Sequence, residues 1–137
     1  MNSTQLADKI SQLMLEKKGE EIRILDIRNL TTVSDYFVIC TASSDTQVKA
    51  IADHISKETK KIDERPWHNE GYSNLNWVLL DFVNVVAHIF LPDVRKFYNL
   101  EGLWADAEVT EVIDKPAPRK RTSKAKVKEK SEEAEEE

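Results

Sequence analysis

Apolar residues in the N-terminal half of the chain recur in two segments with helical spacing. They fall every three or four positions over residues 6–14 and again over residues 48–62, as in helices that bury one side. Gly19 follows the first segment and is a residue type that commonly ends a helix. Ser44 and Gln47 precede the second segment with the spacing of a capping box. The pattern therefore predicts two amphipathic helices.

Shorter segments rich in aromatic and β-branched residues have the character of strands. They cover residues 21–27, 36–42, 77–82 and 85–91. Residues 66–75, with a proline, a glycine and several asparagines, are predicted to be irregular. Pro92 fits the first turn of a short helix that continues over residues 94–98, and Asn99 is placed to cap a further turn. This order predicts an α+β fold: a single domain with a mixed β-sheet and flanking helices, mainly on one face.

The last two predicted strands are separated only by Val83 and Asn84, a spacing that predicts a tight hairpin. With this turn, Leu79 lies opposite His88 and Trp77 lies opposite Phe90, because opposed residues share a side of the sheet. One side is then wholly apolar and is predicted to be core: Val78, Leu80, Phe82, Val85, Ala87, Ile89 and Leu91. The other side mixes large apolar groups with two ionisable ones and is predicted to be a contact surface: Trp77, Leu79, Asp81, Val86, His88 and Phe90.

The length of 137 residues fits one domain, and the distribution of charge suggests where it ends. Residues 1–114 hold 12 Lys and Arg against 19 Asp and Glu, a net charge of −7, although the whole chain carries only −5. The remaining residues hold 8 basic and 6 acidic side chains and almost no large apolar ones. We therefore expect a folded domain over residues 1–112 and a disordered charged tail over residues 113–137.

Several protein classes are disfavoured by the same sequence. The longest continuous apolar run covers residues 85–91, far short of the roughly 20 residues of a membrane helix, so no membrane association is expected. The N-terminus lacks the pattern of a secretory signal, and the single Cys40 cannot form an intramolecular disulfide. We expect a cytoplasmic protein.

Catalysis by metal-dependent nucleotidyl transfer is compatible with the predicted order of elements but not with the acidic residues. That chemistry needs two carboxylates converging on Mg²⁺, whereas the relevant strand offers only Asp81. The histidines His54, His68 and His88 do not have the spacing of a metal site. We therefore predict no catalytic residue, no metal ligand and no cofactor.

The segment from Lys115 to Lys128 contains seven basic residues in fourteen. It is either a solvated linker or a contact to nucleic-acid phosphates, since clustered cations release counterions when they bind a phosphate backbone. The acidic end at residues 132–137 would weaken such binding, so both interpretations stay open.

Taken together, motifs along residues 5–108 resemble the ribosomal silencing factor family, also called RsfS, Iojap or YbeB. No single short motif carries the resemblance; it rests on Asp26, Ser34 to Ile39, Ser44, Gln47-Val48, Glu70-Gly71, Trp77 to Asp81, His88 to Phe90, Arg95, Tyr98 and Leu100 to Trp104. The chain departs from the family at the hairpin turn, where Val83-Asn84 replaces the usual Gly-Asp.

The resemblance implies a non-enzymatic factor that binds ribosomal protein L14 of the large ribosomal subunit. Docking there would sterically block association with the small subunit and repress translation under nutrient limitation or in stationary phase. It also implies a nucleotidyltransferase-like fold without catalytic carboxylates, and a possible homodimer. The partner-binding residues that it implies are Glu70, Ser73, Trp77, Leu79, Asp81, His88 and Tyr98.

Two other functions remain as alternatives. Organellar relatives of this family act in assembly of the large subunit, so the same surface could bind an immature subunit. An enzyme of nucleotidyltransferase type is the other rival, and it is disfavoured by the solitary Asp81. The tail from Lys115 to Lys128 could add a contact to ribosomal RNA.

Overall fold

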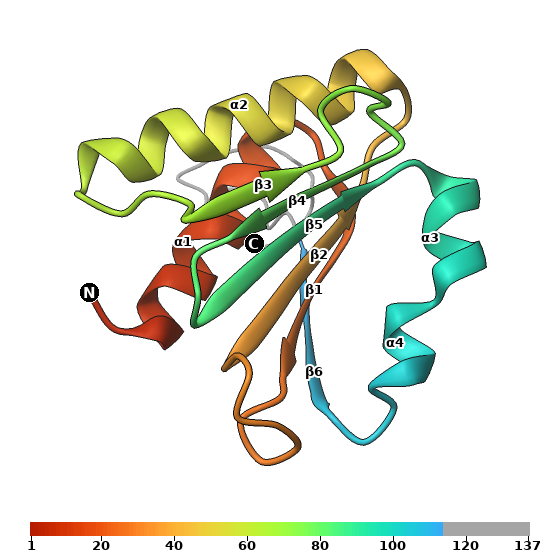
Figure 1. Ribbon diagram of the computed structural model, residues 1–137. Coiled ribbons are helices and arrows are strands. Elements are labelled where there is room, and N and C mark those ends of the chain that lie inside the picture. The colour runs from red at the N-terminus through yellow and green to blue at the C-terminus, as the bar shows by residue number, and fades with distance from the viewer. Residues whose placement is uncertain (114–137) are drawn as a thin grey trace, which may run out of the picture.

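The computed structural model of the protein describes residues 1–113, and within them the chain forms one sheet flanked by helices (Figure 1). The helices are α1 (Ser3–Glu16), α2 (Asp45–Lys61), α3 (Pro92–Tyr98) and α4 (Leu100–Leu103). The strands are β1 (Glu20–Asp26), β2 (Tyr36–Thr41), β3 (His68–Glu70), β4 (Trp77–Asp81), β5 (Val85–Phe90) and β6 (Glu108–Val112).

The sheet has the strand order β3-β4-β5-β2-β1-β6. The β2–β5 pair is parallel and every other neighbouring pair is antiparallel, so the predicted mixed sheet and α+β class are confirmed. A parallel pair needs a long connection between its strands, and α2 with β3 and β4 provides it.

Helices α1 and α2 cover one side of the sheet and build the main core with it. The predicted hairpin register is confirmed, because Leu79 pairs with His88 and Trp77 with Phe90. Val78, Leu80 and the other apolar residues predicted on that side lie in this core. Burial of the apolar side of α1 and α2 against the sheet, rather than helix propensity, stabilises helices of this length.

The starts of both long helices are capped, although one cap differs from its predicted form. The Ser44 side chain accepts the Gln47 backbone N–H, as expected. The Gln47 side chain does not return to Ser44; it accepts the Ser43 N–H and donates to the carbonyls of Lys17 and Lys18. It thereby ties the end of α1 to the start of α2, which sequence spacing alone does not reveal.

The opposite side of the sheet is covered only in part. Val94, Leu100, Trp104 and Ala107, from α3, α4 and the turn that follows, pack on a second core of Leu25, Ile27, Ile39 and Phe90. These helices stand over β5, β2 and β1, reach only Trp77 at the start of β4, and leave β3 and the rest of β4 without a helical cover on this side (Figure 1). The helices thus lie mainly, but not wholly, on one face.

An ion pair between the buried Arg95 and the partly buried Glu101 anchors this second cover. The Arg95 guanidinium donates to the Glu21 carbonyl and the Thr41 hydroxyl, each at 2.8 Å, and forms a two-point contact with Glu101. Arg23 approaches Glu101 from β1. Since a buried charge is tolerated only when it is paired and hydrogen-bonded, these contacts fix α3 and α4 against the sheet.

Two strands were not predicted. β3 lies inside the segment expected to be irregular, and β6 follows the last expected helix. All three residues of β3 are exposed, as are all but the last of β6, so neither strand has the apolar alternation that marks a half-buried strand. Both form by backbone pairing at the two edges of the sheet.

None of the helices within residues 1–113 is long and apolar enough to cross a membrane. The tail predicted over residues 113–137 lies outside the described residues except for its first residue, and so does the segment from Lys115 to Lys128. The boundary at residue 112 therefore stays a prediction.

Candidate functional site

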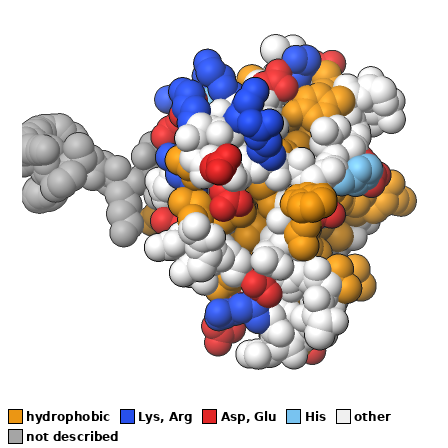
Figure 2. All heavy atoms as spheres, turned by 60° about the vertical axis from the view of Figure 1, so that its left-hand side comes forward, with side chains coloured by type: hydrophobic (Ala, Val, Ile, Leu, Met, Phe, Trp, Pro, Cys, Tyr) orange, Lys and Arg blue, Asp and Glu red, His pale blue; other side chains and the backbone are white. Residues whose placement is uncertain are grey.

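The uncovered part of the sheet presents one compact row of side chains, which we call the open face. It consists of the residues of β3 and β4 that point away from α1 and α2: His68, Glu70, Trp77, Leu79 and Asp81. Residues paired across two strands share a side, and His68 pairs with Asp81 while Glu70 pairs with Leu79. Figure 2, which turns the left-hand side of Figure 1 forward, shows histidine, acidic and hydrophobic side chains close together at its right-hand edge.

Trp77 is half-buried at one end of the open face and is held by aromatic neighbours. Its ring lies 4.9 Å from the Phe90 ring in a stacked arrangement and 4.8 Å from the Tyr98 ring, measured between centroids. Its indole N–H donates to Nδ1 of His88 at 3.1 Å. These contacts hold the indole ring of Trp77 in one orientation, and part of its surface stays accessible to solvent.

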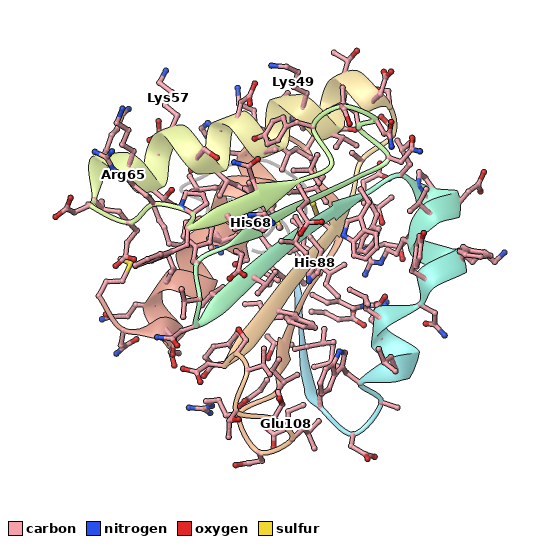
Figure 3. All side chains as sticks on the ribbon, viewed as in Figure 1. Lys49, Lys57, Arg65, His68, His88 and Glu108 are labelled. Atoms are coloured by element: carbon pink, nitrogen blue, oxygen red, sulfur yellow. The ribbon has the colours of Figure 1, made fainter. Side chains whose placement is uncertain are left out.

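His88 is the one predicted site residue that lies below the surface. Its side chain is 3% exposed and is surrounded by Phe37, Phe90 and Trp77 (Figure 3 labels His88 on β5). Burial lowers the pKa of His88 to about 3, so the ring is neutral near neutral pH. Because Nδ1 accepts the hydrogen bond from the Trp77 indole N–H, the ring proton of the neutral imidazole sits on Nε2. His88 thus supports Trp77 from below instead of offering its own surface.

The same correction applies to the rest of the predicted contact surface on β5. Val86 and Phe90 face the expected side of the sheet but are buried, Phe90 to 1% exposure. The cover from α3 and α4, together with Trp77, accounts for the burial of Phe90. Only the β4 half of that predicted surface is open.

The charges on the open face are mostly negative. Asp81 lies at the end of β4, where its Oδ1 accepts the Val83 backbone N–H at 2.8 Å. Glu70 on the edge strand is exposed and contacts His68 at 2.7 Å. Both carboxylates flank the half-exposed Leu79, so an apolar centre lies between acidic groups.

The remaining predicted site residues lie at the margin of this face. Tyr98, at the end of α3, is 52% exposed and packs on Trp77. Ser73 is exposed in the turn between β3 and β4. Gly71 in that turn has φ +95°, and a Cβ there would lie 1.9 Å from the Trp77 carbonyl oxygen, so only glycine allows the turn to pass so close to β4.

The described residues show no arrangement suited to metal-assisted catalysis. Asp81 faces His68 and Val86 on the neighbouring strands, and its same-side neighbour along β4 is Leu79. No group of three His, Cys, Asp or Glu in residues 1–113 could hold a metal ion. Burial raises the pKa of the Cys40 thiol to about 12, which leaves it protonated and poorly nucleophilic.

The fold and the open face define a small α+β protein that exposes part of a mixed sheet as a preformed, partly apolar and acidic surface. The chain belongs to the family of ribosomal silencing factors, because the family model described as "Ribosomal silencing factor during starvation" matches residues 1–137.

Individual relatives support this membership. The "Ribosomal silencing factor RsfS" of Bacillus subtilis is 40% identical over 97 residues, covering 71% of this chain and 82% of the relative. The protein of the same name from Halalkalibacterium halodurans is 35% identical over 112 residues, covering 82% of this chain and 96% of the relative. A crystal structure of a Chromobacterium violaceum protein matches with a TM-score of 0.75 at 29% identity, covering 86% of this chain and 98% of its own.

A more distant relative has a different name. The "Mitochondrial assembly of ribosomal large subunit protein 1" of Mus musculus is 29% identical over 100 residues, covering 71% of this chain and 44% of the relative.

Two features of the site were missed by sequence reasoning. His68 joins the open face only because β3 pairs with β4, and β3 has no apolar pattern to announce it. Arg95 fixes the helix that ends in Tyr98, through bonds to residues 74 and 54 positions earlier in the chain. No local spacing encodes such distant partners.

Proposed function

We propose that this protein binds the large ribosomal subunit through ribosomal protein L14, with the open face as the docking surface. A factor docked there would exclude the small subunit sterically and so repress translation under nutrient limitation or in stationary phase. No reaction and no cofactor take part in this function, and the cytoplasm is where it would operate. Membership in the ribosomal silencing factor family supports the proposal.

The observation that carries the proposal is the composition of the open face. Protein interfaces combine a well-packed apolar centre with a polar rim, and aromatic anchors supply much of the binding energy. Leu79 and the half-buried Trp77 provide such a centre, and Glu70 and Asp81 provide an acidic rim. An acidic rim suits a basic ribosomal protein, since complementary charge speeds encounter and fixes orientation.

Preorganisation strengthens the argument. The contacts of Trp77 with Phe90, Tyr98 and His88 hold its ring before any partner arrives. A side chain already fixed in one rotamer loses little entropy on binding, which would otherwise cost about 0.5–1.5 kcal/mol.

Co-sedimentation with separated ribosomal subunits tests the docking surface. Glu70→Lys reverses an exposed charge, and Leu79→Ala removes the apolar centre with little effect on the main core. We expect each variant to bind large subunits at least about tenfold more weakly, the size of a moderate interface contact. Glu108→Lys on β6 and Val33→Ala in the β1–β2 loop, both exposed and away from the open face, serve as matched controls.

The proposal is wrong if the chain binds small and large subunits equally, or if the control variants lose as much binding as the open-face variants. A subunit-joining assay then tests the consequence of docking. Adding the protein before the two subunits are mixed should reduce the yield of joined ribosomes, and Glu70→Lys should restore it.

A role in large-subunit assembly is the second candidate, and the name of the Mus musculus relative favours it. The same open face would then bind a precursor particle in preference to the finished subunit. Co-sedimentation with precursor and mature large subunits in parallel separates the two functions. Preferential binding to precursors supports assembly, and equal or preferential binding to mature subunits supports silencing.

A further inference from the structure

The segment that leads from α2 into β3 places a tryptophan at the edge of the sheet. Trp67 is 83% exposed, although a side chain of this size usually gains by burial. Its position is fixed, because its backbone N–H donates to the Asp81 carbonyl at 2.8 Å. Trp67 therefore stands exposed on an ordered backbone, next to but outside the open face.

Basic side chains lie at the end of α2 and in the segment that leads to this tryptophan. Lys57, Lys60 and Lys61 lie in the last turns of α2, and Arg65 follows two residues before Trp67. Figure 3 shows Lys57 and Arg65 at the same end of α2, and Figure 2 shows several basic side chains in the upper part of the molecule.

Three of these four basic side chains have no ion-pair partner within the described residues. Lys61 is paired with Glu58 at 2.9 Å, whereas Lys57, Lys60 and Arg65 form no ion pair within residues 1–113. The intervening Asp63 and Glu64 offset two of these three charges. The cluster is still net positive in a domain whose overall charge is strongly negative.

The chain also enters this segment by a tight turn. Asp63 has a left-handed backbone with φ 65°, and the N–H groups of Ile62, Asp63 and Glu64 donate to carbonyls in the last turn of α2. The turn brings the residues after α2 back toward the β3 edge, so cations and tryptophan are held on one ordered stretch of chain.

An exposed aromatic ring among unpaired cations is the combination with which proteins bind unpaired nucleotides. The ring stacks on a base, and the cations contact the flanking phosphates. We propose that Trp67, with Lys57, Lys60 and Arg65, forms a contact site for single-stranded or looped RNA. The site rests on the proposed function in one respect: ribosomal RNA next to the docked open face is the expected source of that RNA.

Fluorescence anisotropy with a labelled, mixed-sequence RNA of about 12 nucleotides tests the site in the full-length protein across a salt series. Trp67→Ala should weaken binding about tenfold and leave the salt dependence unchanged, because stacking releases no counterions. Trp67→Phe should retain most of the affinity. The same RNA annealed into a duplex should bind more weakly, since its bases are already stacked.

The cations are tested by a triple variant, Lys57→Gln with Lys60→Gln and Arg65→Gln. It should reduce the slope of log K against log salt by about 2, in line with three lost phosphate contacts. The matched control, Lys9→Gln with Lys17→Gln and Lys18→Gln, removes the same charge from α1 and the residues that follow it, and none of these three lysines forms an ion pair within residues 1–113. It should change the slope far less.

The proposal is overturned if the RNA does not bind, if Trp67→Ala binds RNA as well as the unaltered chain, or if both triple variants weaken binding equally. The last result would mean that only net charge matters. The basic segment from Lys115 to Lys128 is present in every variant, so a difference between the variants does not come from it.

Failure of the RNA site and failure of the proposed function have different signatures. Loss of oligonucleotide binding in Trp67→Ala, with no large-subunit binding by any variant, would support the RNA site and refute docking. Large-subunit binding that depends on Glu70 but not on Trp67 would support docking. If Trp67→Ala also bound the oligonucleotide as well as the unaltered chain does, the RNA site would be refuted. If Trp67→Ala weakens subunit binding but not RNA binding, Trp67 contacts a protein surface and the RNA proposal is refuted.

Discussion

Mild acid should destabilise this protein through His88, although most carboxyl groups are still ionised there. The buried ring is neutral in the folded state because burial lowers its pKa to about 3. In the unfolded chain a histidine titrates near its ordinary pKa of about 6.5. Between these two values the unfolded chain binds a proton that the folded protein does not accept. The contribution of the neutral His88 to the free energy of unfolding is therefore fully present above about pH 6.5 and is lost as the pH falls toward 3.

The size of the effect follows from the distance between the working pH and the unfolded pKa. Each pH unit in this window is worth about 1.4 kcal/mol, so acidification from about pH 7 to about pH 5 should lower the free energy of unfolding by about 2 kcal/mol. Since small domains are stable by only about 5–15 kcal/mol, this change is readily measured.

Urea unfolding at the two pH values measures it, with His88→Asn as the comparison. Asparagine does not titrate and retains an acceptor close to the position of Nδ1 for the Trp77 indole N–H. The variant should be less stable at both pH values, because it loses the ring contacts with Phe37 and Phe90, but its stability should depend less on pH by about 2 kcal/mol.

A second titrating group, Glu101, does not account for the loss of stability expected between about pH 7 and about pH 5. Although burial raises the pKa of Glu101, the bonds from Arg95 and Arg23 outweigh it and hold the pKa below its ordinary value. Its stabilising contribution is therefore lost only at more acidic pH. Equal pH dependence in the original chain and in His88→Asn would refute the reasoning, since it would show that the ring accepts a proton without unfolding.

Three further substitutions test how the open face is supported, each by urea unfolding. Val83→Gly should raise the free energy of unfolding by about 1 kcal/mol, because a β-branched residue with φ 76° is strained and glycine is not; a lower midpoint would contradict this. Gly71→Ala should cost about 2 kcal/mol or more through the clash with the Trp77 carbonyl, and an unchanged midpoint would show that the turn can shift. Glu101→Gln should cost about 3 kcal/mol by leaving Arg95 buried without its ion-pair partner, and a neutral effect would mean that water reaches the guanidinium.

The hairpin shows how far local pattern can predict a surface. A two-residue turn sets the register of two strands, and the register decides which side chains share a side. Trp77, Leu79 and Asp81 were predicted together on this basis, and the structure places them on one side of β4. The prediction succeeded because every interaction involved lies within fifteen residues of sequence.

The exposure of that side could not be predicted in the same way. His88 and Phe90 were expected at a contact surface, but His88 lies beneath Phe37 and Trp77, and Phe90 is covered by Trp77 and by α3 and α4. The position of α3 and α4 depends on Arg95, which forms hydrogen bonds to Glu21 and Thr41, far away in the sequence. An edge strand such as β3 was missed for a related reason: its backbone pairs with β4 while its exposed side chains carry no apolar signal.

The sequence by itself determined the α+β class, the two long helices, the hairpin register and the sidedness of β4, because each follows from apolar periodicity and turn spacing over short distances. Tertiary structure decided which part of that side stays uncovered, that His88 lies beneath Trp77, and that Trp67 stands exposed beside the cations of α2. Periodicity specifies which residues face the same way. What packs against them is decided by segments distant in sequence, whose contacts form only when the whole chain folds.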